Sequence, residues 1–161
     1  MIFTTKAEYG VRLLVELGRH GSQDPVSLKA IAEAEGLPLA YLERIVALLK
    51  KAELVESTRG AHGGYRLARP AGEITMDEAV LALEGVVAPM ACFVDDSDGK
   101  VLCSHEADSG RGCATKLLWT RVQGGMVEAM KRTTLSELIE FSTRNAPAAT
   151  GPELPLVIAN G

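Results

Sequence analysis

The chain has 161 residues, of which 47% are hydrophobic and 4% aromatic, so aliphatic side chains must form most of its core. This length suits one ordinary domain, or a small domain with an oligomerisation element. A net charge of −4 argues against nonspecific binding to nucleic acid. No signal peptide or membrane-spanning apolar run is evident, so we expect a cytoplasmic protein with no membrane partner, where free thiols persist.

The charge is divided unevenly along the chain. Residues 1–70 contain ten Lys or Arg against eight Asp or Glu, whereas residues 71–161 contain seven against thirteen. The net charges of the two parts are therefore +2 and −6. This asymmetry is compatible with a basic DNA-reading part and an acidic remainder, although an excess of +2 also fits ordinary surface variation.

Two helices are predicted at the start of the chain. Between residues 5 and 20 the apolar side chains recur at helical spacing. Thr5 and Glu8 have the spacing of a capping box, which would begin this helix. Ser27 is placed to cap a second, shorter helix that ends near Gly36.

A third helix and a β-hairpin are predicted next. Pro38 suits the first turn of a helix, and the basic Lys51 suits its C-terminal end. Two short strand-like segments, 55–58 and 65–67, flank the glycine-rich loop 59–64. Three helices and a hairpin within about 65 residues are the element order of a winged helix-turn-helix.

The remaining chain predicts three more helices. A second capping-box pattern, Thr75 to Glu78, opens a helix that continues through Leu83. A long helix is expected over 114–132, where Gly124 and Gly125 interrupt the pattern and indicate either a kink or the close approach of a partner helix. A last short helix follows a third capping-box pattern at 134–137.

The third predicted helix is the expected DNA-reading helix. In a helix-turn-helix the N-terminal residues of this helix face the base edges in the major groove. Glu43 can accept from a cytosine amino group, and Arg44 can reach guanine or phosphate. At the hairpin tip, Arg59 and His62 could enter a minor groove. The residues expected at the start of the reading helix are Leu39, Ala40, Tyr41, Glu43 and Arg44. The alternative is a winged helix that contacts only protein.

All three cysteines, Cys92, Cys103 and Cys113, lie within 22 residues between predicted helices. An odd, clustered set of thiols indicates metal binding or redox chemistry more than structural disulfides. Zinc sites commonly place two ligands two to four residues apart, and these spacings are wider. Spacing alone therefore leaves metal binding and inert or redox-active thiols both open.

Four segments together resemble the Rrf2 family of bacterial transcription regulators, which includes iron–sulfur and nitric-oxide sensors. The resemblance extends over about residues 1–143, and the hairpin motif is its most specific part. The segments are TTKAEY (4–9), YLE (41–43), RGAHGGYRL (59–67) and TLSEL (134–138).

The resemblance implies a homodimer that binds a palindromic operator in double-stranded DNA. By this resemblance, helix 114–132 packs against its mate, and Glu43 and Arg59 contact DNA. This chain has Ala61 and His62 where many members carry Pro-Gly, so the wing contact can differ in detail.

With this resemblance, the predicted fold is mainly α: a winged helix-turn-helix with a long C-terminal dimerisation helix. The predicted parts are a DNA-binding domain, a linker helix with a cysteine-containing cluster loop, a pair of dimerisation helices and a flexible tail. Their boundaries are 1–70, 71–113, 114–143 and 144–161.

The resemblance also implies that Cys92, Cys103 and Cys113 bind an iron–sulfur cluster, with [2Fe–2S] favoured over [4Fe–4S]. IscR-like members place a histidine three residues after the last cysteine, where this chain has Lys116. Other members use a carboxylate of the opposite subunit at the position of Glu8. We rank Glu8 above His105 as the fourth ligand. The competing roles are a capping-box acid for Glu8 and an exposed loop histidine for His105.

The predicted function is therefore a dimeric DNA-binding transcription regulator, expected to be a repressor, that senses iron–sulfur, redox or nitric-oxide status through a bound cluster. One alternative keeps the fold but senses through a reversible disulfide or zinc. Another is a winged-helix adaptor that is regulated by a protein partner. No nucleophile–base pair, phosphate loop or carboxylate pair indicates an enzyme.

Overall fold

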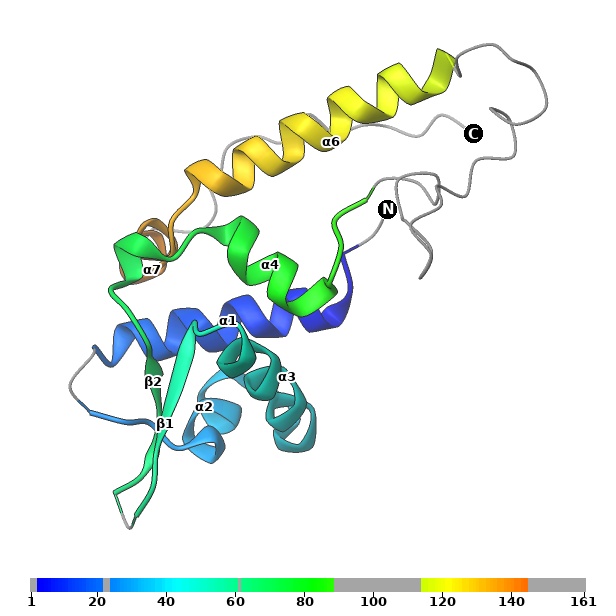
Figure 1. Cartoon of the computed structure of the whole chain (residues 1–161). Helices are drawn as coiled ribbons and strands as arrows, with labels where there is room; N and C mark the ends of the chain where they lie inside the picture. Colours follow the sequence, from blue (N-terminus) through cyan, green and yellow to red (C-terminus); the bar gives the residue numbers. More distant parts are fainter. Residues whose placement is uncertain (1–2, 22–23, 61, 89–113, 145–161) are drawn as a thin grey trace.

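The computed structural model describes residues 3–21, 24–60, 62–88 and 114–144. The three cysteines, His105 and the predicted tail from residue 145 lie outside these ranges. The elements, in chain order (Figure 1), are α1 (Thr5–Arg19), α2 (Leu28–Glu35), α3 (Leu39–Lys51), β1 (Val55–Thr58), β2 (Gly64–Leu67), a 3-10 turn η1 (Ala71–Glu73), α4 (Met76–Glu84), α6 (Ala114–Arg132) and α7 (Leu135–Thr143). This order confirms the predicted winged helix-turn-helix.

Helix α1 lies at the centre of the fold. Figure 1 shows α2 and α3 on one side of it and α4 on the other. Its inward side chains Leu13, Leu14 and Leu17 are fully buried, because the apolar spacing places them on the faces that meet these neighbours. The core continues through fully buried side chains of α2, α3, α4 and α7, namely Ile31, Leu42, Ile45, Leu49, Leu83 and Leu135.

Three of the predicted helix starts are confirmed by their hydrogen bonds. Ser27 Oγ accepts from the Ala30 backbone N–H at 3.1 Å and so begins α2. Thr75 and Thr134 begin α4 and α7, and each backbone N–H donates to the carboxylate three residues later at 3.1 Å.

Helix α1 begins at Thr5 as predicted, but the capping box predicted from Thr5 and Glu8 is wrong. The N-cap is Thr4 rather than Thr5, and its hydroxyl accepts from the Lys6 backbone N–H at 3.2 Å. The carboxylate that completes this helix start belongs to Glu84 of α4, which accepts from Thr4 Oγ1 at 2.6 Å and from Thr4 N at 3.2 Å. Glu8 is therefore not a capping-box residue, because a distant acid takes that place.

The hairpin has the predicted strands and one addition. Val55 pairs with Leu67 at its base and Thr58 with Gly64 near its tip. On the other side of β2, Val26 forms a two-bond antiparallel bridge with Tyr65. A Cβ at Gly64 would lie 2.5 Å from the Val26 carbonyl oxygen, so this glycine is required by the backbone of the protein itself.

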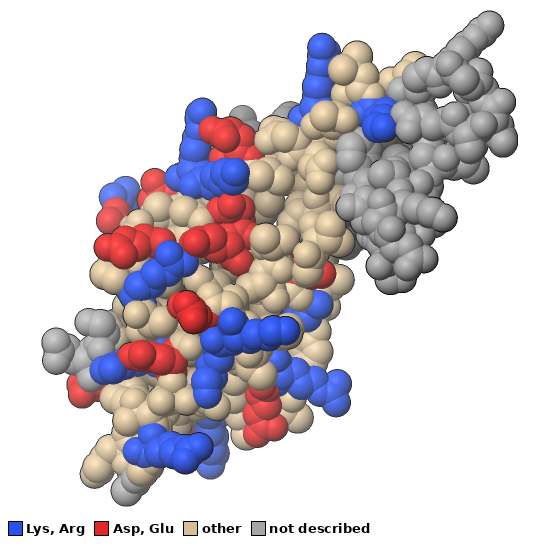
Figure 2. All heavy atoms as spheres, in the orientation of Figure 1, with Lys and Arg blue, Asp and Glu red and all other residues tan. Residues whose placement is uncertain are grey.

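Helix α6 is continuous through Gly124 and Gly125, so the two glycines do not interrupt it. A Cβ at either glycine would meet nothing within 4 Å in the part of the chain described. No residue of α6 is buried, and Leu117 is 61% exposed. Figure 2 shows an uncharged stretch in the region of this helix. The helix thus presents an apolar surface that α4, its neighbour in Figure 1, does not cover.

The end of α3 contains a strained residue. Glu53 has φ of 58°, the left-handed conformation that favours glycine. Its N–H donates to the Lys50 carbonyl at 3.0 Å, and the Leu54 N–H donates to the Leu49 carbonyl at 3.0 Å. These two bonds form a Schellman motif with a glutamate in the position usually taken by glycine.

We predict that Glu53→Gly raises the free energy of unfolding by about 0.5–1 kcal/mol, because it removes the left-handed strain. The matched control is Glu33→Gly inside α2, where the backbone is helical and glycine should cost about 1 kcal/mol. Urea unfolding of both variants measures the two effects. A Glu53→Gly variant no more stable than wild type would contradict this account of the strain.

Candidate functional site

The exposed start of α3 is the first part of the candidate nucleic-acid interface. Leu42 and Ile45 face inward, which leaves Ala40, Glu43 and Arg44 exposed on the opposite face. The side chains of Glu43 and Arg44 form no hydrogen bond or ion pair with any residue that the structure describes. Both side chains are therefore available to base edges or phosphates.

Tyr41 is placed differently from its predicted DNA-contact neighbours. It is half-buried, and its ring meets the ring of Tyr9 edge to face, with centroids 5.7 Å apart and an interplanar angle of 88°. Such pairs contribute roughly 0.5–1.5 kcal/mol beyond the buried area. The contact ties the first turn of α3 to α1, so Tyr41 positions the reading helix, and its contact with DNA remains a prediction.

The hairpin supplies one unpaired arginine. Arg66 is engaged across the strands by Glu56, whereas Arg59 at the tip is exposed and has no partner among the described residues. Figure 1 shows the hairpin projecting from the side of the molecule that carries α2 and α3. Arg59 is thus the wing cation that is free to contact DNA.

His62 is exposed beside the start of α2. With Asp24, Pro25, Ser27 and Gly63 it lines an open hollow of about 400 Å³ between the wing and that helix. On the face shown in Figure 2, basic and acidic side chains are intermixed, and no extended area of one sign is present.

An ion-pair network holds α2 against α1. Arg12 Nε donates to Glu35 Oε2 at 2.8 Å, and Arg12 Nη2 donates to the Glu35 carbonyl oxygen at 2.5 Å. Arg19 contacts the same carboxylate at 3.4 Å and donates to the buried Glu16 at 2.9 Å. The network fixes the end of α2 immediately before the turn into α3. No sequence motif marks it, because its partners are far apart in the chain.

Glu8 lies at the edge of a second hollow, between α1 and α4. This hollow of about 330 Å³ is lined mostly by apolar residues: Phe3, Thr4, Ala7, Glu8, Val11 and Val80. Glu8 is exposed, and its carboxylate makes no hydrogen bond or ion pair within the described ranges. A carboxylate without a structural partner is available to coordinate a metal ion or to accept a hydrogen bond from outside the subunit. The cysteines, His105 and any contact that they make with Glu8 lie outside the described residues.

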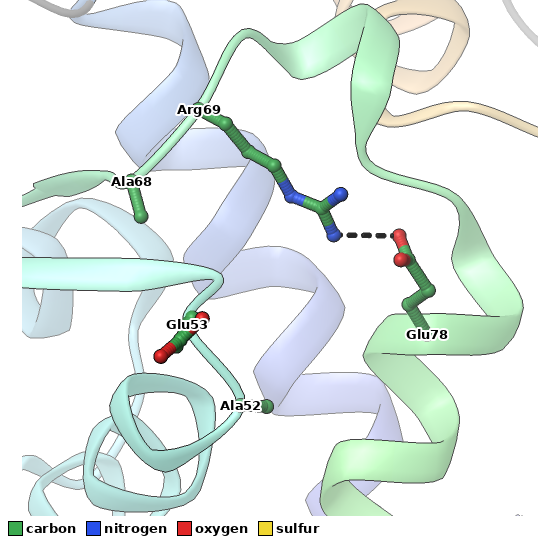
Figure 3. Close-up of a pocket in the computed structure, with 5 residues that line it drawn as sticks. All are labelled: Ala52, Glu53, Ala68, Arg69 and Glu78. Carbon is green, nitrogen blue, oxygen red and sulfur yellow. Dashed lines mark hydrogen bonds and ion pairs between the residues drawn. The ribbon is translucent and has the colours of Figure 1, made fainter.

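A third hollow, of about 530 Å³, separates the end of α3 from α4 (Figure 3). Arg69 reaches across it, and its Nη2 donates to Glu78 Oε2 at 2.8 Å. This hydrogen bond lowers the pKa of Glu78 below its ordinary value, with a further contribution from the Thr75 backbone N–H, and burial opposes the shift. The pair attaches the first turn of α4 to the residues that follow β2.

We predict that Glu78→Gln flattens the pH dependence of stability in acid. A lowered pKa stabilises the fold above the unfolded value of 4.5, and this contribution is lost as pH falls through the folded value. At neutral pH the variant should be less stable by under about 1 kcal/mol, because the ion pair is partly exposed. Urea unfolding at neutral and acid pH measures this.

The matched control is Glu137→Gln in the capping box of α7, whose carboxylate has no arginine partner among the described residues. It should change the acid dependence less than Glu78→Gln does. Equal flattening by the two variants would remove the role assigned to Arg69.

The fold and the exposed reading helix and wing define a winged helix-turn-helix transcription regulator. The model of the Rrf2 family, described as "Iron-dependent Transcriptional regulator", matches residues 3–141. The chain belongs to this family. It is thus a transcription regulator and not an enzyme, and members of the family bind DNA and typically act as dimers.

Two relatives illustrate the match. The protein rrf2 of Nitratidesulfovibrio vulgaris is 37% identical over 139 residues, which cover 86% of this chain and 87% of that protein. The HTH-type transcriptional regulator IscR of Vibrio cholerae is 34% identical over 141 residues, covering 86% of this chain and 75% of the relative.

Solved structures agree with the fold. The global cysteine regulator CymR of Bacillus subtilis superimposes with a TM-score of 0.71 at 33% identity, covering 88% of this chain and 98% of that one. IscR of T. potens gives 0.70 at 32% identity, covering 92% and 93%. None of the helices in the described ranges is long and apolar enough to cross a membrane.

Proposed function

We propose that the protein is a homodimeric repressor that binds a palindromic operator and responds to the chemical state of Cys92, Cys103 and Cys113. The DNA-binding part rests on three exposed side chains that have no partner among the described residues. Glu43 and Arg44 lie at the start of α3, and Arg59 lies at the tip of the hairpin, which projects on the same side of the molecule as α3. Glu43 and Arg44 enter the major groove, and Arg59 enters the adjacent minor groove.

The proposed dimer forms along α6. A single chain leaves Leu117, Leu118 and Val122 exposed on a helix with no buried residue, and burying such side chains is favourable. Gly124 and Gly125 provide open backbone against which a second helix can lie closely. A two-fold dimer of this kind presents two reading helices, which matches the symmetry of a palindromic operator.

The proposed cofactor is an iron–sulfur cluster, held by the three cysteine thiolates of one subunit and by Glu8 of the partner subunit. The donor set fits, because thiolates are the usual cluster ligands and the Glu8 carboxylate has no other partner among the described residues. A bound cluster would supply sensitivity to oxidants or nitric oxide. We favour [2Fe–2S] over [4Fe–4S], and His105 is the second candidate for the fourth ligand.

A second candidate function is supported by the likeness to CymR of B. subtilis, a global cysteine regulator. The CymR of Staphylococcus aureus, which is also similar to this chain, was solved in an oxidized form. In this case the same DNA-binding fold senses through thiol oxidation, and Glu8 has no ligand role. Zinc held by the cysteines would be a variant of this second function.

Anaerobic purification with iron and sulfide analysis separates the two functions. A coloured protein with both elements supports the cluster, and a colourless protein with reactive thiols supports thiol sensing. A salt-dependent mobility shift of the protein's own promoter DNA tests the shared part, and its absence would favour an adaptor that binds only protein.

We predict that Arg59→Ala weakens operator binding and reduces the slope of log affinity against log salt by about 1, because one positive charge no longer lies near the phosphates that flank the minor groove. The matched control is Arg66→Ala, which removes a hairpin arginine already engaged by Glu56 and should change the slope less. Fluorescence anisotropy over a salt series measures both. Equal slopes for Arg59→Ala and wild type would exclude the wing contact.

We predict that Glu8→Ala shifts the visible spectrum of the anaerobic protein and lowers its iron content, while its thiol count and melting temperature stay unchanged. The melting temperature is expected to hold because the exposed Glu8 carboxylate makes no hydrogen bond or ion pair within the described residues. The control is Glu33→Ala, an exposed helix acid in a surface ion pair. A Glu8→Ala cluster spectrum identical to wild type would exclude Glu8 as a ligand.

A further inference from the structure

The last residue of α4 caps the first turn of α1. Glu84 Oε1 accepts from both the hydroxyl and the backbone N–H of Thr4, and Glu84 Oε2 lies 4.0 Å from Lys6 Nζ. The carboxylate is largely buried, with 13% of its side chain exposed. It lies at the positive end of the α1 dipole, where a negative charge is favoured.

The helix that carries this carboxylate is pressed against α1. A Cβ on Gly10 would lie 2.3 Å from Leu83 Cδ1, so a larger residue at this position would require the buried Leu83 side chain to move. Gly10 is adjacent to Tyr9, and the Tyr9 ring contacts Tyr41 at the start of α3. The end of α4, the start of α1 and the reading helix therefore form one continuous series of contacts.

The chain that leaves α4 turns at Gly85 and is held to α6 at Val87. Gly85 follows with φ of 80°, and the Val87 carbonyl accepts from Gln123 Nε2 of α6 at 2.8 Å. The cysteine-bearing residues begin shortly after Ala88. Among the described residues before the cysteine-bearing part, Glu84 is thus the last whose charged side chain contacts the DNA-binding domain.

We propose that Glu84 is a positioning residue through which the state of the cysteine-bearing part of the chain acts on α1 and then on α3. This inference rests on the proposed sensing function. A displacement of the end of α4 withdraws the carboxylate from Thr4 and uncaps the turn of α1 that contains Glu8. The Tyr9–Tyr41 contact then passes the movement of α1 to the reading helix. A purely static cap would stabilise α1 equally in both states.

The test compares operator affinity in two preparations of the full chain, one kept anaerobic and one exposed to hydrogen peroxide. In wild type the two affinities should differ several-fold. In Glu84→Ala their ratio should fall to within about twofold of one, because the coupling between the two parts is lost. Glu84→Gln keeps an oxygen acceptor and should give an intermediate ratio. The control, Glu128→Ala, removes an exposed ion pair on α6 and should keep the wild-type ratio.

Thr4→Ala provides an independent variant if Glu84→Ala does not fold, since it removes the hydroxyl on the other side of the contact, which also caps the Lys6 N–H. It should reduce the same ratio, and the double variant should be no worse than Glu84→Ala alone. Amide hydrogen exchange should become faster in the first turns of both α1 and α3 in the variants.

The outcomes separate this inference from the proposed function. A wild type with equal operator affinity in both preparations would overturn the sensing function, and with it the coupling. A responsive wild type together with Glu84→Ala and Thr4→Ala variants that respond equally would overturn the coupling alone.

Discussion

The burial of α1 on both sides is the constraint on which the remaining structure depends. One part of its surface packs on α2 and α3, the helix-turn-helix, and another packs on α4, which leads to the cysteine-bearing residues. Leu13, Leu14 and Leu17 are fully buried between these neighbours. Because a close-packed interior transmits strain, a change in the position of α4 relative to α1 must be accommodated at α3 as well.

The capping interaction at the start of α1 determines whether Glu8 has a structural role. Since Glu84 provides the carboxylate beside Thr4, Glu8 is released from a structural role and is left exposed at an apolar hollow. The same exchange joins α4 to α1 through a charged contact. Structural capping and candidate ligand chemistry are therefore divided between two acids that are distant in the sequence.

The proposed activity needs more than one subunit. Each chain presents one reading helix and one wing arginine, and a palindromic operator requires two of each. The exposed side of α6 and its two unobstructed glycines supply a surface for the second copy. Glu8 is accessible in one chain, which suits a ligand that belongs to the site of the partner subunit. Dimerisation would thus complete both the DNA-binding surface and the sensing site.

The sequence by itself determined the element order, the helix starts at Ser27, Thr75 and Thr134, and the bounds of the helix from 114 to 132, because these depend on interactions between near neighbours in the chain. Only the tertiary structure decided which acid caps α1 and that Tyr41 packs on Tyr9. Those outcomes depend on contacts between residues distant in sequence, such as Thr4 with Glu84, and no local pattern encodes them. Because Glu84 rather than Glu8 is the carboxylate that contacts Thr4, the Glu8 carboxylate has no partner among the described residues, and this supports its proposed role as a ligand.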